Sequence, residues 1–478
     1  MINIVFKNLV YEEFEPFAIN IKKYIYSSKA NKNVSPTIQS NSIPQDLIED
    51  VKKHLSENHK NLIKESFGKK EKKEALRSVI EEYIAKDDTQ LGLSLDELSK
   101  GIVDAVAGLG PLEIFNENDL VTDIICNDFD EIWITDLNEG EYLSDVKFAS
   151  RKEYEEVCNK IVNASGQNWT FSKPDVDADF PNMRVNIVGF DISQDGISLG
   201  IRKFSKDIRI NEETIIETKQ ANPLMLTLLK AVVKAQSRIL ISGSTGAGKT
   251  ELLKYLYGYT KDTERGIMIQ DTNETFLKHN YPKKNIKTWK TRQSEDGLNE
   301  INAERLTRSV LRQNPDWVLF GESRGGEAWH MYKLARTGHG IMTSLHSKGA
   351  VESVDRIADM CSEAVTMDQN LLSKGIAKTF DIGIHMEKML DGRRRITEIV
   401  EYTGFENGEV QYNPLFLFEI DLETEMVDEL GRYKYRVEGK HVQNGHISSA
   451  LVRQLKRFGA YTDELAPLIK EEKLVGIS

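Results

Sequence analysis

One stretch of eight residues constrains the fold of this chain more than any other. It runs from Gly243 to Thr250, reads Gly-Ser-Thr-Gly-Ala-Gly-Lys-Thr, and satisfies the pattern G-x-x-x-x-G-K-[S/T]. An apolar, β-branched run at 238–242 precedes it, and a segment of helical character at 251–256 follows it. Strand, glycine loop and helix in this order predict a loop that binds phosphate groups.

The residue types of this loop suit a nucleotide. Glycines let successive backbone N–H groups turn toward phosphate oxygens, and the N-terminus of the following helix favours an anion. Lys249 would place a positive charge at the terminal phosphates, and the hydroxyl of Thr250 could bind magnesium. We therefore expect ATP and Mg²⁺ as cofactors, with the nucleotide held by Gly243, Ser244, Thr245, Gly246, Ala247, Gly248, Lys249, Thr250 and Glu251.

Composition limits what kind of protein surrounds this loop. With 478 residues, of which 40% are hydrophobic and 29% charged, we expect a soluble globular chain of about three domains. A net charge of -12 argues against broad nucleic-acid binding, which needs a basic surface. No apolar run is long enough to span a membrane and the N-terminus lacks a signal-peptide pattern, so any membrane role would be peripheral.

The three cysteines give no sign of a metal site. Cys126, Cys158 and Cys361 are scattered and form no C-x-x-C pair. They are most simply reduced core thiols in a cytoplasmic protein.

Hydrophobic periodicity divides the chain into five expected parts. Four apolar runs that alternate with helical segments, at 238–242, 266–271, 317–321 and 340–345, predict a mostly parallel sheet covered on both faces. The parts are an N-terminal extension, 1–95, with a polar linker at 27–44 and a helical segment; an α+β domain, 96–205; a linker, 206–220; a nucleotide-binding α/β domain, 221–405; and a mainly helical C-terminal appendage, 406–478.

Polar residues follow the predicted parallel strands at the edge where ligands bind such sheets. Glu322 ends the apolar run 317–321, which is typical of a Walker B element, and it would bind magnesium directly or through water. Asp271 and Glu274 follow another run and could act as a base toward water, although acids in this position also cap helices. His346, after the run 340–345, could sense the γ-phosphate, and no convincing partners for a metal accompany it.

This set of motifs resembles one family, the hexameric secretion ATPases of type II and type IV systems. The likeness rests on the phosphate loop, an Asp box at 270–274, the Walker B element at 319–328 and a His box at 337–347. Segments 108–113, 177–186, 201–204 and 308–316 are most similar to the CpaF branch, the motors of Tad pili, with conjugation-type secretion ATPases as close relatives. The resemblance covers about residues 95–405.

The resemblance implies an α/β fold in which a RecA-like P-loop domain follows an α+β N-terminal domain, with helical extensions at both ends. It further implies a cytoplasmic homohexamer at the inner face of the membrane, with nucleotide between the two domains. ATP turnover would move these domains, and an inner-membrane platform protein would convert the motion into pilus assembly or export. By motif match, Arg184 and Arg202 would act as arginine fingers on the γ-phosphate, unless they make only surface ion pairs.

One departure from the family pattern affects the expected chemistry. The Asp box usually begins with glutamate, but this chain has Gln270, whose neutral amide cannot accept a proton. Either Glu274 or Glu322 then supplies the base, or turnover is slow. The chain also lacks the tetracysteine zinc element, which argues against the type II secretion branch.

Three functions remain open at this point. The first is an ATP-hydrolysing motor for a Tad-type pilus or a secretion machine, with conjugative DNA transfer as the closest rival role. The second is a nucleotide-gated scaffold with little hydrolysis, suggested by Gln270. The third is a motor acting directly on DNA, which the acidic charge and the lack of a basic, aromatic groove disfavour.

Overall fold

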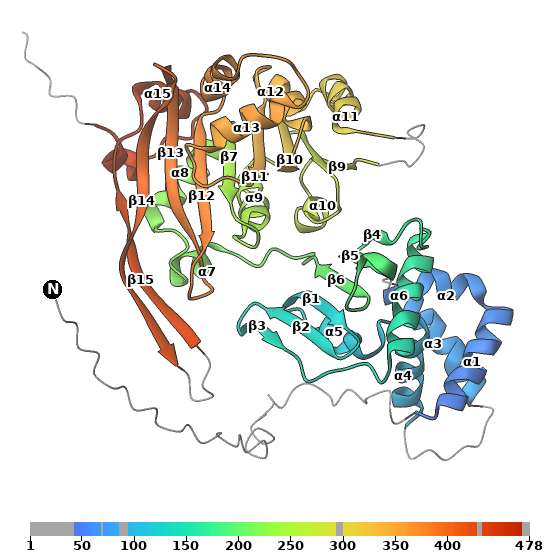
Figure 1. The fold of residues 1–478 in the computed structure, drawn as a ribbon. Helices are drawn as coiled ribbons and strands as arrows, with labels where there is room; N and C mark the ends of the chain where they lie inside the picture. Colours follow the sequence, from blue (N-terminus) through green and yellow to red (C-terminus); the bar gives the residue numbers. More distant parts are fainter. Residues whose placement is uncertain (1–42, 68–69, 86–93, 293–299, 428–432, 471–478) are drawn as a thin grey trace, which may run out of the picture.

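The computed structural model describes residues 43–67, 70–85, 94–292, 300–427 and 433–470 (Figure 1). The strand-helix element expected near residues 1–28 and most of the expected linker 27–44 lie outside this part of the chain. The described residues form a small helical bundle, a six-stranded sheet and a nine-stranded sheet (Figure 1). No helix within these ranges has the length and apolar composition needed to cross a lipid bilayer.

The first four helices pack around a core of their own. Their apolar residues recur at helical spacing, and a capping box between Ser94 and Glu97 starts the fourth helix. The buried residues include Val51, Leu55, Leu76, Ile80 and Ile102. The helices are α1 (Gln45–Asn58), α2 (Lys60–Ser66), α3 (Lys70–Ile84) and α4 (Leu95–Ala107).

The N-terminal domain is built on a six-stranded antiparallel sheet with the order β3-β2-β1-β6-β5-β4. Every second residue of these strands enters a core that helix α6 (Arg151–Ser165) completes. The strands are β1 (Val121–Asp128), β2 (Glu131–Asp136), β3 (Gly140–Leu143), β4 (Asp175–Phe180), β5 (Met183–Val188) and β6 (Ser198–Lys203). Shorter helical turns precede and join them: η3 (Gly110–Leu112), α5 (Glu113–Glu117) and η4 (Phe190–Ile192).

A second sheet of nine strands carries the phosphate loop, in the order β15-β14-β13-β12-β7-β11-β10-β8-β9. The strands from β12 to β9 are parallel, which confirms the predicted sheet type. They are β7 (Arg238–Gly243), β8 (Gly266–Gln270), β9 (Ile286–Lys290), β10 (Trp317–Ser323), β11 (Gly340–Leu345) and β12 (Ile382–Lys388). The sequence predicted four of these parallel strands, and β9 and β12 are additional.

Helices cover both faces of this parallel sheet, as predicted. Ile239 and Ile241 of β7 point into one core and Leu240 into the other, so the central strand is buried on both sides. The helices in chain order are α7 (Glu212–Glu217), α8 (Pro223–Lys234), α9 (Lys249–Tyr257), α10 (Leu277–Asn280), α11 (Ala303–Val310), η5 (Leu311–Gln313), α12 (Glu327–Ala335), α13 (Ser353–Ser362) and α14 (Gln369–Ala377).

The prediction of a mainly helical appendage at 406–478 is wrong for most of that range. Three antiparallel strands extend the sheet beyond β12: β13 (Arg394–Glu406), β14 (Glu409–Val427) and β15 (Tyr433–Gln443). Asn407 and Gly408, both with positive φ, make the tight turn between the first two. Among the described residues of this range, only α15 (Ser449–Arg457), which was predicted, and η6 (Asp463–Leu468) are helical.

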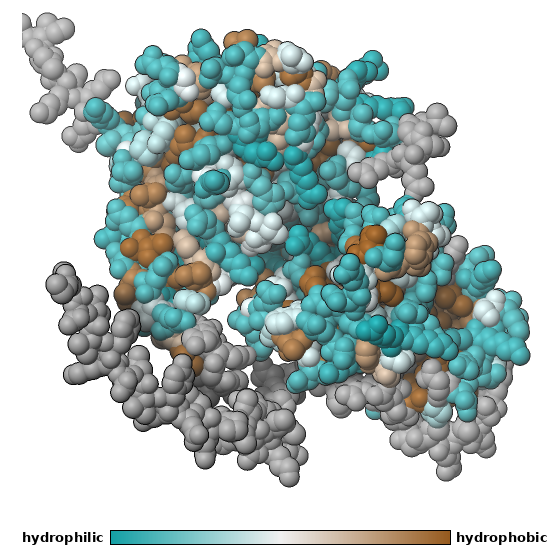
Figure 2. Space-filling model, viewed as in Figure 1, coloured by the Kyte–Doolittle hydropathy of each residue, from teal (hydrophilic) through white to brown (hydrophobic). Residues whose placement is uncertain are grey.

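The outer ends of β14 and β15 extend past the rest of the sheet as a two-stranded arm (Figure 1). Several large apolar side chains of this arm are exposed, and Figure 2 shows hydrophobic surface over these strands. They include Ile420, Leu422, Met426 and Val427.

Candidate nucleotide site

The loop after β7 has the backbone that phosphate binding requires. Gly243, Gly246 and Gly248 adopt φ values of 149°, 76° and 93°, which L-residues with side chains rarely adopt. A Cβ atom on Gly243 would lie 2.2 Å from the carbonyl oxygen of Met386 on β12, so a side chain has no room there. Helix α9 begins directly after this turn, with Lys249 and Thr250 as its first two residues.

The side chain of Lys249 folds back into the loop. Its Nζ donates to the carbonyl oxygens of Gly243 (2.8 Å) and Ser244 (2.9 Å), and it lies 3.4 Å from Nδ1 of His346. Burial lowers the pKa of Lys249 to about 8, against the opposing effect of the nearby Glu322. An anion in the loop would favour the charged amine, so this lysine is suited to bind phosphate.

The predicted convergence of strand ends is confirmed. Strands β7, β11, β10 and β8 are neighbours, and they bring His346 and Glu322 to the edge of the phosphate loop. Nε2 of His346 lies 2.8 Å from Oε1 of Glu322, and burial together with Lys249 lowers the pKa of this histidine. Arg324 donates to the other carboxylate oxygen of Glu322 from Nε (2.9 Å) and Nη2 (2.6 Å).

One oxygen of Glu322 lacks a hydrogen bond. The His346 contact at 2.8 Å is within ion-pair distance but does not have hydrogen-bond geometry, so Oε1 is a buried acceptor with no donor among the described residues. An unsatisfied buried carboxylate oxygen is costly. A cation or an ordered water beside the loop would satisfy it, and the half-buried hydroxyl of Thr250 offers a second oxygen ligand. The donor set therefore fits Mg²⁺.

The segment after β8 places one acid in the site and keeps another at its edge. Glu274 is largely buried, and burial together with the negative charge of Glu322 raises its pKa. Asp271 is exposed and accepts a hydrogen bond from Thr291 (2.7 Å). Gln270 is buried, donates to Asn273 and accepts from Thr275, both at 2.9 Å, so its amide holds the segment that carries Glu274.

A narrow cleft separates the N-terminal domain from this edge of the sheet. Its volume is about 60 Å³, whereas pockets that hold small molecules are usually about 300 Å³ or more. The two domains would therefore have to shift to admit a nucleotide that reached across. The lining residues are Arg184, Arg202, Phe204, Gln270, Asp271, Thr272, Glu274, Gly321, Glu322 and Arg324.

Arg184 and Arg202 face this cleft but are held by aspartates of their own domain. Nε of Arg202 donates to Asp123 (2.9 Å), and Nη2 of Arg184 lies 3.5 Å from a carboxylate oxygen of Asp177. Both arginines are partly exposed, and exposed pairs of this kind contribute little to stability. Of the two alternatives drawn from the sequence, the structure shows the surface ion pairs; a role as arginine fingers stays a prediction, although both residues line the cleft.

Comparison with known proteins identifies the family. Residues 105–378, more than half of the chain, match the family model described as type II/IV secretion system protein. The chain belongs to this family. It is 26% identical to an uncharacterized protein of Bacillus anthracis, over 72% of this chain and 76% of that one, and 26% identical to a putative conjugal transfer protein of Mycobacterium tuberculosis, over 62% and 84%. The solved VirB11 ATPase of the Brucella suis type IV secretion system covers 61% of this chain and 93% of its own, with 23% identity and a TM-score of 0.34.

The matched segment of this type II/IV secretion system protein contains both walls of the cleft. It includes the phosphate loop, Glu274, Glu322 and His346 on one side and the two arginines on the other. It ends before β12, so Met386, whose carbonyl oxygen excludes a side chain at Gly243, lies outside it. Strand β12, which packs against Gly243 in this secretion system protein, therefore lies beyond the matched residues.

Sequence reasoning missed three contacts around the site. Arg324, within the recognised Walker B element, pairs with Glu322, and its spacing of two residues along a strand end was an available signal. Arg394 of β13 donates from Nε to the carbonyl oxygen of Gly246 (2.9 Å), and nothing in the local sequence indicates this. Glu251 accepts from the backbone N–H of Arg209 (2.9 Å) and from Lys254 (2.7 Å), so its carboxylate ties the interdomain segment to α9.

Proposed function

We propose that this chain is a Mg²⁺-dependent ATPase, a motor that powers assembly of a Tad or type IV-like pilus, or a type II/IV secretion machine, at the cytoplasmic face of the membrane. The observation that carries the proposal is the position of the Glu322 carboxylate. It lies beside the phosphate loop, one of its buried oxygens accepts no hydrogen bond from the described part of the chain, and Arg184 and Arg202 face the same cleft. Family membership supports the secretion role.

In this proposal the residues of the phosphate loop bind the nucleotide, and the residues at the strand ends orient the reacting groups. Loop N–H groups and Lys249 hold the terminal phosphates, as helix N-termini and lysines do in other phosphate loops. Thr250 and Glu322 would hold Mg²⁺, Glu322 directly or through water. The ion supplies positive charge that neutralises the phosphate oxygens. His346, 3.4 Å from Lys249, would sense the γ-phosphate by hydrogen bonding.

Glu274 is the better placed of the two glutamates to accept a proton. Its raised pKa moves it toward the range in which a carboxylate works as a base. Glu322 is engaged by Arg324 through two hydrogen bonds, which favours an orienting role. Asp271 would assist from the exposed edge of the cleft. Gln270, whose amide donates one hydrogen bond and accepts another within this segment, would position Glu274.

Movement between the domains would couple turnover to work. Arg184 and Arg202 would leave their aspartate partners and stabilise the charge on the γ-phosphate when the cleft closes on a nucleotide. The resemblance to secretion motors supports a homohexamer that pushes on an inner-membrane platform protein. We expect no direct contact with nucleic acid, because the chain carries a net charge of -12.

Two alternatives each have an observation in their favour. A conjugation role is supported by the similarity to a putative conjugal transfer protein. A nucleotide-gated scaffold with little hydrolysis is supported by Gln270, which cannot serve as a base. Neighbouring genes for prepilins or for a relaxase would separate pilus assembly from conjugation.

The deciding experiment is steady-state ATPase activity with magnesium, together with the mass in solution by light scattering, for the wild type and Glu322→Gln. We expect turnover in a hexamer, slowed by a factor of about a hundred or more in the variant, with nucleotide binding nearly intact. Equal turnover in both proteins would remove Glu322 from the mechanism. A hexamer that binds nucleotide without turnover, even with a membrane partner, would favour the scaffold.

A further inference from the structure

A cavity of about 400 Å³ lies in the N-terminal domain between α6 and the loop that precedes β6. It is lined by Ile197, just before β6 begins, whereas Arg202 lies near the other end of that strand. None of its lining residues belongs to the nucleotide cleft. They are Asp128, Arg151, Tyr154, Glu155, Asn159, Trp169, Phe190, Ser193, Gly196 and Ile197.

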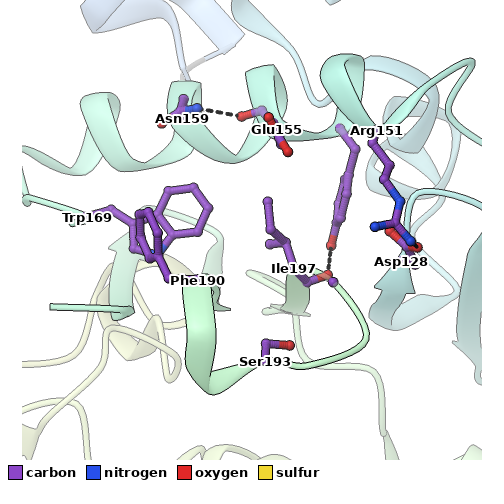
Figure 3. Close-up of a pocket in the computed structure, with 10 residues that line it drawn as sticks. Asp128, Arg151, Glu155, Asn159, Trp169, Phe190, Ser193 and Ile197 are labelled. Carbon is purple, nitrogen blue, oxygen red and sulfur yellow. Dashed lines mark hydrogen bonds and ion pairs between the residues drawn. The ribbon is translucent and has the colours of Figure 1, made fainter. Parts of the chain in front are cut away.

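Aromatic rings form one wall of this cavity. Figure 3 shows Trp169 and Phe190 together on one side, with ring centroids 5.0 Å apart. Phe171 does not line the cavity, but its ring centroid lies 5.8 Å from that of Phe190 and it is 68% exposed. The indole N–H of Trp169 donates to the carbonyl oxygen of Pro174 (2.9 Å), and a Cβ atom on Gly189 would lie 2.4 Å from its ring, so this tryptophan is fixed in place.

Phe190 has a strained backbone conformation and a partly exposed ring. Its φ is +57°, a conformation that bulky L-residues rarely adopt, and its side chain is 40% exposed. Burial therefore does not offset the strain, and glycine would adopt this backbone more easily. Strained positions that present a side chain outward are typical of ligand contacts.

The charge inside the cavity is unbalanced. Arg151 is paired with Asp128 at the end opposite the aromatic wall. Glu155 projects from α6 between the wall and this pair (Figure 3), and its carboxylate has no ion pair or side-chain hydrogen bond recorded with any described residue. Among the lining residues, the uncompensated charge is thus a single carboxylate beside two aromatic faces.

We propose that this cavity binds an arginine side chain carried by a segment of a partner protein. A guanidinium stacks on Trp and Phe faces and pairs with a carboxylate through two parallel hydrogen bonds. Apolar residues flanking that arginine would cover the exposed side chains of Phe171 and Ile192 at the rim. The site is separate from the nucleotide cleft, so the proposal does not depend on ATP hydrolysis.

The test is a binding titration of the full-length protein with an acetylated leucine-arginine-leucine amide, by calorimetry. The matched peptide carries citrulline, which has the shape of arginine without its charge. We expect the arginine peptide to bind on the order of ten-fold more tightly than the citrulline peptide. Equal affinity for the two peptides would overturn the proposal.

Three variants locate the binding. Glu155→Gln should reduce arginine-peptide affinity to the citrulline level, whereas Glu156→Gln, the next carboxylate on α6 and not a lining residue, should not. Phe190→Gly removes the ring while permitting the positive φ, so it should fold and lose the peptide. Wild-type affinity in Glu155→Gln or in Phe190→Gly, at an unchanged melting temperature, would exclude this cavity as the binding site.

Discussion

At the scale of single residues, the phosphate loop brings groups of like charge close together. Lys249 lies close to His346, and its burial lowers its pKa, whereas burial and the negative charge of Glu322 raise the pKa of Glu274. A bound nucleotide would supply negative charge beside Lys249, and magnesium would supply positive charge beside Glu274 and Glu322. The sequence predicted these residues because each follows a glycine loop or an apolar strand, but the distances among them depend on strand order.

Lys249→Ala removes the cation that faces the terminal phosphates. We expect ATP affinity to fall roughly 10- to 100-fold, since a hydrogen bond to a charged group contributes about 1.5–3 kcal/mol. The measurement is a titration with a fluorescent ATP analogue. Lys261→Ala, which alters an exposed lysine outside the loop, serves as the control. Unchanged affinity in the loop variant would argue against the loop as the phosphate site.

The rate of ATP hydrolysis should depend on the protonation of Glu274. The pKa of Glu274 is raised, and its carboxylate can no longer accept a proton once the pH falls below that raised value. Activity should therefore decline at a higher pH than it would with a glutamate of ordinary pKa. Glu274→Gln should lower kcat and abolish this acid limb. A pH–rate profile of both proteins checks the assignment, and an identical acid limb in the variant would assign it to another group.

At the scale of elements, the N-terminal sheet and the parallel strands were largely predictable, while the last three strands were not. Runs such as 238–242 are short, apolar and followed by helices, so their type was clear. The turn at Asn407-Gly408 is a strong hairpin signal that the prediction overlooked. Strand β9 (Ile286–Lys290) has only a short stretch with mixed lysines, and its place at the sheet edge comes from pairing with β8.

Strand β13 supports the phosphate loop through Arg394. Its guanidinium holds the carbonyl oxygen of Gly246, and its side-chain stem lies against Gly248. Arg394→Ala should loosen the loop, so we expect KM for ATP to rise several-fold with little change in kcat. Arg393→Ala changes the exposed neighbouring arginine and should leave KM as it is. Steady-state kinetics would measure KM for both variants, and equal KM values would argue against a positioning role for Arg394.

At the scale of the whole molecule, few polar contacts join the N-terminal domain to the nucleotide domain across the cleft. Asp179 of β4 pairs with Lys290 of β9 at 2.7 Å and lies 3.4 Å from the hydroxyl of Thr272. Such a partly exposed pair adds at most about 1 kcal/mol. We call this Asp179–Lys290 pair the clasp. Because it is weak, it can break when the cleft opens for a nucleotide. The domain arrangement could not be predicted, because these contacts join residues about a hundred positions apart.

Lys290→Asp should release this clasp by placing two acids face to face. We expect the interdomain distance distribution, measured by pulsed spin-label spectroscopy, to broaden, with a population shift of no more than about five-fold. The double variant Asp179→Lys, Lys290→Asp restores opposite charges and should restore the wild-type distribution. A double variant as broad as the single one would show that the pair does not act as a clasp.

The position of β7 affects how the chain can fold as it leaves the ribosome. This strand carries the phosphate loop, yet its two neighbours are β11 and β12, which are synthesised about 100 and 140 residues later. Until then its hydrogen-bonding edges are unpaired, a condition that slows folding and favours aggregation. A fragment that stops at residue 378, where the family match ends, would contain the motifs of the nucleotide site and still leave one edge of β7 open.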